Sequence, residues 1–588
     1  MTAKLFDITK FKTGGGTKDQ YSRQLQRLTG SGKSVDCIEK AVQGALDGLS
    51  RPGRKSFVIY GEPQSGKTEM MICLTAKLLD EGRGFILHLL NDSVDLLGQN
   101  LGRFKNSGIS PSARNFSEIL DPAINVKTGT HVVFCKKNAN DLQKLLNKIK
   151  GLKDIVVIDD EADYASPNAK INSAGKTRIN QLIELILGQF GDYIGVTATP
   201  ARLNLNNTFK NDSKLWVNFP AHEHYTGQDI FFPIDDSESH SKIAKFQLTL
   251  LPDSGDDPKF ARTALFRFFV NAAYLNTHNN TIEQCYSMLI HTSGKKVDHS
   301  TDWRTMHDAL AALSTKSSKK FDSYVKEIWA IARDRYVDAD PDQMTNHILK
   351  NIDRNAIIIL NSDSDFRQNG TSATNPSSLF TIVIGGNIVS RGVTFDNLLS
   401  MFFTRDVKHK IQQDTYIQRA RMFGSRGPYL RFFDLTIPLA LYADWHRCFV
   451  FHRLSLASIT DGQGSPVWLS DSRIAAVAGA SIDKSTVDID RGEMAFSLFR
   501  YSDKIDVIVK ADYSTATKLQ ELYGVLGDEA FPDYLRRFIV RTSDNIDIAV
   551  SIQQTAGVYP SMTEDEKKSI SRRKGMMGAS PDFSQRAF

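Results

Sequence analysis

The most regular pattern in the chain is a series of short apolar runs separated by longer amphipathic stretches. Five such runs lie between residues 56 and 200, and they read SFVIYG, GFILHLLN, HVVFCKK, DIVVIDDE and DYIGVTATP. Runs rich in Val, Ile and Phe without polar alternation are typical of strands buried on both faces, which occur mainly in parallel sheets covered by helices. This part of the chain therefore predicts a parallel α/β lobe.

This pattern of apolar runs becomes weak after about residue 202 and resumes after residue 260. The later runs are SMLIHTS, AIIILNS, FTIVIGG, LLSMFFTR and YLRFFDLTIP. We therefore expect a second α/β lobe, because the pattern of buried strands and amphipathic stretches is the same. The predicted division is an N-terminal helical segment at 1–50, a first lobe at 51–225, a connector at 226–259, a second lobe at 260–440 with a helical insertion at about 300–350, and a mixed α/β C-terminal domain at 441–588.

Length and composition agree with several soluble domains. The 588 residues are too many for one ordinary core, and 41% are hydrophobic while 24% are charged. The sequence contains neither an apolar run of about 18 residues nor a signal-peptide pattern, so we expect no membrane contact. Five scattered cysteines without a Cys-x-x-Cys pair indicate a reduced, cytoplasmic protein. The net charge of +6 permits a polyanionic partner without requiring one.

The stretch Tyr60–Glu69, YGEPQSGKTE, fits the phosphate-binding loop pattern Gly-x-x-x-x-Gly-Lys-Thr. A predicted strand precedes it and a predicted helix follows it, as this motif requires. The backbone N–H groups of such a loop and the helix N-terminus bind phosphate. Lys67 is expected to reach the β- and γ-phosphates of ATP, and Thr68 to bind Mg²⁺. The residues predicted to bind the nucleotide here are Gly61, Glu62, Pro63, Gln64, Ser65, Gly66, Lys67, Thr68 and Glu69.

The run VVIDDEAD places acidic residues at the C-terminal end of a buried strand, the edge at which parallel sheets bind ligands. Asp160 is predicted to hold Mg²⁺ together with Thr68, and Glu161 to orient or deprotonate the attacking water. The simpler alternative is a solvated acidic helix cap. The phosphate loop makes the catalytic interpretation the stronger one.

Four segments in the expected order resemble motifs of superfamily-two helicases. DEAD at Asp160–Asp163 and TATP at Thr197–Pro200 look like motifs II and III. GGNIVSRGVTFDNL at Gly385–Leu398 and DTYIQRARMFGSR at Asp414–Arg426 look like motifs V and VI. The resemblance implies two RecA-like P-loop lobes that close on ATP.

In such enzymes, an arginine of motif VI neutralises the charge that builds on the γ-phosphate. Arg421 and Arg426 are the candidates, and Arg419 is a weaker one. For any one of these arginines, a surface salt bridge is the alternative. Motif V is expected to add Arg391 and Gly392 to the nucleotide site.

The match is closer still to the Z-one domain family of helicase-like ATPases. YGEPQSGKT, MLIHTS, IIILNS, IGGNIVSRGVTFDNL and DTYIQRARMFGSRGPYLRFFDL carry the resemblance, which covers roughly residues 50–450. Members of this family are described as endonucleases. The resemblance therefore implies a role in bacterial ATP-dependent restriction or anti-phage defence. Ala420, Met422, Ser425 and Thr394 depart from the residues usual in these motifs.

The sequence lacks a convincing nuclease site. HSK at His240–Lys242 has Gln247 where a phospholipase-like nuclease needs aspartate, and Glu566-x-Lys568 lies in a charged cluster rather than at a strand end. His446 and His452 are six residues apart, do not share a helix face, and are predicted to be packing or surface residues. DNA cleavage is therefore expected from a separate nuclease subunit.

The resemblance favours a DNA-dependent ATPase or translocase acting on DNA, most simply double-stranded DNA. Two alternatives stay open: an ATP-switched scaffold that recruits a nuclease or effector without translocating, and an RNA helicase. Segments following the strands are candidates for phosphate contacts. They are Asn91–Arg103, Lys136–Asn138, Thr292–Lys296 and Ser390–Thr394. The sequence does not indicate an oligomeric state.

Overall fold

The computed structural model describes most of both predicted lobes and short pieces beyond them. The described residues are 19–173, 175–233, 246–252, 257–279, 281–291, 296–360, 373–386, 395–403, 411–418 and 420–460, followed by 474–475, 482–483, 504, 507–508, 511–530, 537, 549–551 and 585–587.

The first lobe contains a seven-stranded sheet in the order β3-β4-β2-β5-β6-β1-β7. All its strand pairs are parallel. The five apolar runs predicted as strands form β1, β2, β4, β5 and β6, and their interiors are buried. The strands are β1 (Ser56–Tyr60), β2 (Phe85–Leu90), β3 (Arg114–Asn115), β4 (His131–Lys136), β5 (Ile155–Asp160), β6 (Asp192–Thr197) and β7 (Val217–Asn218).

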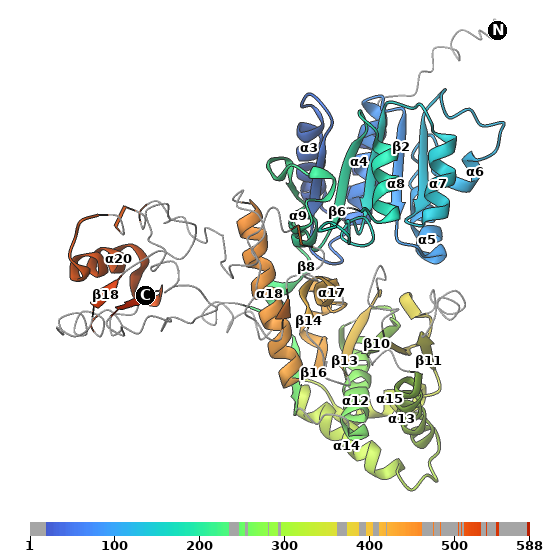
Figure 1. Cartoon of the computed structure of the whole chain (residues 1–588). Helices are drawn as coiled ribbons and strands as arrows, with labels where there is room; N and C mark the ends of the chain where they lie inside the picture. Colours follow the sequence, from blue (N-terminus) through green and yellow to red (C-terminus); the bar gives the residue numbers. More distant parts are fainter. Residues whose placement is uncertain are drawn as a thin grey trace, which may run out of the picture.

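Helices cover both faces of this sheet (Figure 1). On one side lie α2 (Gln20–Gly30), α3 (Asp36–Leu49), α4 (Lys67–Asp80) and α5 (Val94–Asn106), which share one hydrophobic cluster with the strands. On the other side, α7 (Ala139–Lys148) and α8 (Arg178–Leu187) pack in a second cluster. The N-terminal helices therefore pack into the core of the first lobe, because their apolar residues, such as Leu28 and Ile38, are buried there.

The second lobe has a six-stranded parallel sheet in the order β11-β12-β10-β13-β16-β9. Its core is built around the buried helix α12 (Pro258–Tyr274). The predicted helical insertion is formed by α13 (Lys296–Ser314), α14 (Phe321–Arg335) and α15 (Pro341–Asn351). The strands are β9 (Gln247–Leu251), β10 (Tyr286–His291), β11 (Asn355–Leu360), β12 (Phe380–Gly385), β13 (Leu398–Phe403) and β16 (Asp434–Pro438).

Two details of the second lobe differ from the sequence-based expectation. Strand β9 lies inside the stretch predicted as a connector. It is only partly buried, and its sequence QLTLL is not a continuous apolar run, so the sequence does not indicate a strand there. The first residues of the run YLRFFDLTIP belong to a 3₁₀ helix over Gly427–Phe432, and the strand begins only at Asp434. The prediction of two parallel α/β lobes is confirmed by the two sheets.

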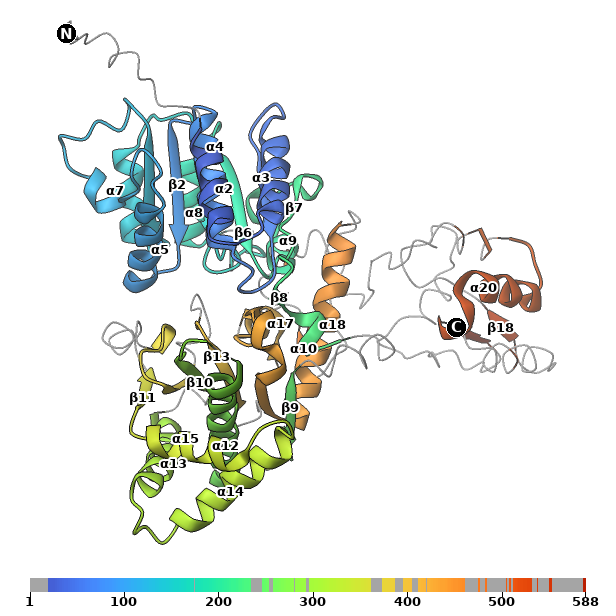
Figure 2. The ribbon, with the colours of Figure 1, turned by 180° about the vertical axis from the view of Figure 1, so that it is seen from behind.

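The lobes meet through the connector and the long helix α18 (Leu439–Thr460). In Figures 1 and 2, α18 runs beside the second lobe and reaches the first. It contacts α9 (Ala201–Leu205) of the first lobe as well as β9 and β16 of the second. Among the described residues, no helix is long and apolar enough to cross a membrane. Most of the predicted C-terminal domain lies outside the described residues, which there include α20 (Thr515–Ala530) and the short parallel pair β18 (Ala549–Ser551) and β19 (Gln585–Ala587).

Candidate nucleotide-binding and hydrolysis site

The predicted phosphate loop connects β1 to α4 and lines a cavity of about 390 Å³ between the lobes. Two backbone requirements explain its glycines. Gly66 has φ +92°, in the left-handed region that glycine adopts without strain. A Cβ on Gly61 would lie 2.8 Å from the Phe219 ring. The loop is therefore shaped by close packing against Phe219, which follows β7, and by a left-handed turn at the start of α4.

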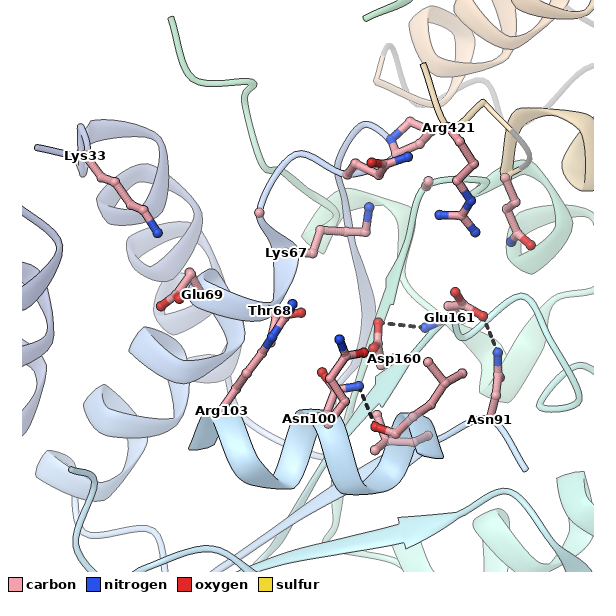
Figure 3. A pocket seen from close by; sticks show the side chains of 18 residues that line it. Lys33, Lys67, Thr68, Glu69, Asn91, Asn100, Arg103, Asp160, Glu161 and Arg421 are labelled. Atoms are coloured by element: carbon pink, nitrogen blue, oxygen red, sulfur yellow. Dashed lines mark hydrogen bonds between the residues drawn. The ribbon is translucent and has the colours of Figure 1, made fainter. Parts of the chain in front are cut away.

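The Lys67 side chain extends along this loop (Figure 3). Its ammonium donates hydrogen bonds to the carbonyl oxygens of Glu62 at 2.7 Å and of Gly61 at 3.3 Å. Burial lowers the pKa of Lys67, and the negative charges of Asp160 and Glu161 oppose this shift. A phosphate group in the cavity would offer the ammonium stronger, charged acceptors than these carbonyls.

Asp160 and Glu161 lie at the C-terminal end of β5 and line the same cavity (Figure 3). Loss of hydration, followed by repulsion from Glu161, raises the pKa of Asp160 to about 7. Asp160 Oδ1 accepts a hydrogen bond from the Glu161 backbone N–H at 3.0 Å. The Glu161 carboxylate accepts a hydrogen bond from the Asn91 side-chain amide, which orients it.

The residues present fit a magnesium ion. Burial raises the pKa of Asp160 despite the nearby charges of Lys67 and Lys137, so the protein compensates this carboxylate only in part. Thr68 lines the cavity with it. The described residues contain no cluster of three or more His, Cys, Asp or Glu side chains that could hold a metal. A magnesium ion at this site would therefore take most of its ligands from phosphate and water. An ion held by one carboxylate, one hydroxyl, phosphate oxygens and water is the arrangement that Mg²⁺ prefers.

The second lobe contributes Gln418 and Arg421 to this cavity. Gln418 belongs to α17 (Gln413–Gln418), and its side-chain amide donates to Asp163 Oδ2 at 2.5 Å. The other oxygen of Asp163 accepts a hydrogen bond from Thr197 at 2.6 Å. Asp163 therefore joins the segments that resemble motifs II, III and VI in one buried cluster. Its partner Gln418 is three residues from Arg421 in the sequence.

The structure separates the two arginine candidates. Arg421 lines the cavity, whereas Arg426 does not. The Arg426 guanidinium donates hydrogen bonds to the backbone oxygens of Phe395 at 3.1 Å and Arg421 at 3.3 Å, and to the Tyr429 hydroxyl at 3.0 Å. Arg426 is 3% exposed. Its observed contacts therefore hold the backbone of the segment that carries Arg421, so that Arg421 is the better placed candidate for phosphate.

Three candidates fall outside the described residues: Arg391, Gly392 and the weaker candidate Arg419. The nucleic-acid candidates Ser390–Thr394 lie wholly there as well, as do residues 292–295.

The lysines of Lys136–Asn138, predicted to contact nucleic-acid phosphates, are both paired with carboxylates of the protein. Lys137 is fully buried and bonded to the acidic strand end, so it is not a surface cation. Lys136 is paired with Asp92 at 2.9 Å and with Asp141 at 3.5 Å. The burial of Lys137 could not be predicted from the sequence, because lysines are seldom buried and the compensating carboxylate, Asp159, lies on another strand.

Other residues of the cavity were not singled out for the nucleotide from the sequence. The segment Asn91–Arg103, considered for nucleic acid, instead lines the nucleotide cavity through Asn91, Leu96, Gln99, Asn100 and Arg103. Lys33, from the loop between α2 and α3, also lines it. Among the described residues, the buried atoms Gln64 Oε1, Ser65 Oγ and Asn91 Oδ1 have no hydrogen-bond partner, as expected of a site that binds a polar ligand.

The histidines of α18 behave as the sequence predicts. His452 is buried, and burial lowers its pKa to about 3. His446 is hydrogen-bonded through Nε2 to the Pro233 carbonyl oxygen at 2.6 Å. The nuclease candidates His240–Lys242 and Glu566–Lys568 lie outside the described residues.

Family models match both lobes. Residues 33–215 match the SWI2/SNF2 ATPase model, and residues 261–453 match the Z1 domain model, which is the Z-one domain of the resemblance above. None of the curated proteins compared matches the chain. The matches agree with the motif order, and the protein is a helicase-like, ATP-hydrolysing enzyme.

Several solved structures show distant similarity. S. cerevisiae Dbp5 bound to RNA and ADP BeF₃ is 13% identical, with 78% of this chain and 94% of that chain covered and a TM-score of 0.39. The ATP-dependent Type ISP restriction-modification enzyme LlaBIII bound to DNA is 12% identical, with 91% and 37% covered and a TM-score of 0.41. The DUF1998 helicase MrfA bound to DNA and AMPPNP is 12% identical, with 80% and 59% covered and a TM-score of 0.40.

Proposed function

We propose that the protein is a DNA-stimulated ATPase that translocates on or remodels DNA in a bacterial restriction or anti-phage defence system, with a separate nuclease. One observation carries the catalytic part of this proposal. Residues of the phosphate loop, the acidic strand end and Arg421 of the second lobe line a single cavity. A site divided between two lobes makes hydrolysis depend on how the lobes lie, which is what a motor requires.

Each residue has a role that its position permits. Lys67 would bind the β- and γ-phosphates, and Thr68 and Asp160 would hold Mg²⁺, which would neutralise phosphate charge. Glu161, held by Asn91, orients the attacking water and accepts its proton. Arg421 approaches the γ-phosphate from the second lobe and stabilises charge in the transition state.

The preference for DNA rests on the Z1 domain match and the motif series rather than on an observed nucleic-acid contact. Residues of motif V that would contribute to such a contact lie outside the described residues. The experiment must therefore compare DNA and RNA directly.

The test measures steady-state ATP hydrolysis by the full chain alone, with single- or double-stranded DNA, and with RNA of matched length. We expect stimulation by DNA, and loss of hydrolysis in Lys67→Ala. If no DNA stimulates the wild-type enzyme, the DNA-dependent function is wrong. Stronger stimulation by RNA would instead support an RNA helicase.

A second measurement separates a motor from a nucleotide-switched scaffold. Glu161→Gln should retain ATP and slow its hydrolysis, because the amide cannot accept the proton. A triplex-displacement assay on double-stranded DNA reports movement along DNA. ATP-dependent displacement by wild type and its loss in Glu161→Gln support translocation. A wild-type enzyme that hydrolyses ATP on DNA without displacement would contradict it.

A further inference from the structure

A fully buried lysine lies next to the acidic strand end. Lys137 follows β4, and its side chain is 0% exposed. Its ammonium lies 3.0 Å from Asp159 Oδ1, and it donates to the carbonyl oxygens of Asp160 at 2.9 Å and Glu161 at 2.8 Å. Because β2 lies between β4 and β5, the Lys137 side chain spans a whole strand to reach these partners.

The backbone that Lys137 holds has an uncommon conformation. Glu161 has φ +48°, in the left-handed region that is costly for residues other than glycine. Such a conformation persists only where the surroundings fix it. The Glu161 carbonyl oxygen also accepts the Tyr164 N–H at 2.9 Å, and the Ala162 N–H is bonded to the Val196 carbonyl oxygen at 3.1 Å. Lys137 adds a charged donor to this turn from inside the lobe.

Asp159 anchors the lysine from its other side. While Asp159 Oδ1 faces Lys137, its Oδ2 accepts hydrogen bonds from Ser166 at 2.5 Å and from the Tyr193 hydroxyl at 2.7 Å. All these groups are buried. The ammonium is therefore fixed between a held carboxylate and two backbone carbonyls, and a change in its position would be transmitted directly to the turn.

We propose that Lys137 is a positioning residue for ATP hydrolysis. Its ammonium fixes the backbone at Asp160 and Glu161, so that the Glu161 carboxylate points at the attacking water rather than away from the cavity. The inference rests on the proposed role of Glu161. The alternative is an ion pair that only stabilises the lobe, and the two differ in what they predict for turnover in a folded variant.

The test uses the double variant Lys137→Met with Asp159→Asn. Removing Lys137 alone would leave a buried, unpaired carboxylate, which is strongly destabilising, whereas the double variant removes both charges. We expect nucleotide affinity, measured with a fluorescent ATP analogue, and KM for ATP to change by less than about threefold. We expect kcat to fall about 10- to 100-fold, the scale of a small misplacement of a catalytic group.

Two controls make the result specific. Lys136→Met removes the neighbouring cation and its pairs with Asp92 and Asp141, and it should leave kcat unchanged. Asp159→Asn alone leaves the buried ammonium without its counter-ion, so this variant should melt at a lower temperature. It keeps the bonds of the ammonium to both carbonyls, so kcat of the folded variant should fall clearly less than in the double variant. A double variant with the wild-type melting temperature and wild-type kcat would overturn the proposal, and so would a loss in Asp159→Asn alone as large as in the double variant. Failure of DNA stimulation would appear in the wild type and is distinct from both outcomes.

Discussion

Single residues of this protein differ in whether they serve the reaction or the fold, and the arginines of the second lobe illustrate this. Arg421 and Arg426 are five residues apart in a motif-like segment, and the sequence offers both for the same role. Three-dimensional contacts distinguish them, because Arg426 donates to the Arg421 carbonyl oxygen while Arg421 lines the cavity.

Arg426→Ala is therefore expected to act mainly on stability. The change leaves the buried carbonyl oxygens of Phe395 and Arg421 without their donor, which costs roughly 1–3 kcal/mol for each such group. The second lobe should melt at a lower temperature, while the KM for ATP stays near the wild-type value. Differential scanning calorimetry with steady-state kinetics would check this. A stable Arg426→Ala enzyme that has lost turnover would show that Arg426, too, acts on phosphate.

His88 is a second residue whose effect can be stated in advance. It lies inside β2, stacked on Phe134 at 4.6 Å and hydrogen-bonded to the Thr75 hydroxyl at 3.0 Å. Burial lowers its pKa from 6.5 to about 3. The folded lobe therefore keeps His88 neutral, while the unfolded chain takes up a proton below pH 6.5.

The stability of the first lobe should accordingly fall as the pH drops from 6.5 toward 3, by at most about 1.4 kcal/mol per pH unit from this group. His88→Phe should reduce that loss. Melting curves between about pH 7.5 and 5 would measure it, with His224→Asn, an exposed histidine, as the matched control. Equal pH dependence in His88→Phe and wild type would contradict the assignment.

At the scale of elements, the connector between the lobes does more than link them. The short strand β8 (Tyr225–Thr226) pairs with β15 (Gly424–Ser425), just beyond Arg421. The Tyr225 hydroxyl donates to the Pro63 carbonyl oxygen of the phosphate loop at 2.6 Å. One two-residue strand therefore contacts both halves of the nucleotide site.

Tyr225→Phe removes that hydrogen bond and keeps the buried ring. We expect KM for ATP to rise roughly threefold to tenfold, as one hydrogen bond of about 0.5–1.5 kcal/mol implies, with little change in melting temperature. Tyr442→Phe is the matched control, because its hydroxyl likewise donates to a backbone carbonyl, but to that of Phe231 at 2.8 Å, away from the phosphate loop. Equal kinetics in the two variants would exclude a role for Tyr225 in holding the loop.

The elements also show what could be predicted from the sequence. The central strands were predictable, because they are buried on both faces and read as continuous Val, Ile and Phe runs. The edge strands β3, β7 and β9 were missed because they are short or only partly buried. Lys137 was misread because its carboxylate partner comes from a strand that is not its neighbour, and such a pairing leaves no local signal.

At the scale of the whole molecule, the two lobes are joined at the site by polar contacts that can break and form. Gln418 bonds to Asp163, and Arg202 of the first lobe pairs with Asp414 of the second at 3.0 Å. Interfaces of this kind permit relative motion of domains more readily than large apolar ones. If hydrolysis depends on how the lobes lie, the second lobe must itself contribute to catalysis.

Single-turnover ATP hydrolysis by Arg421→Ala tests this requirement most directly. Because Arg421 alone among the described arginines of the second lobe lines the cavity, its removal should slow hydrolysis of bound ATP by about 10³-fold or more while nucleotide binding is largely retained. Hydrolysis at the wild-type rate in Arg421→Ala would mean that the first lobe hydrolyses ATP alone, and the account of a site shared by two lobes would be wrong.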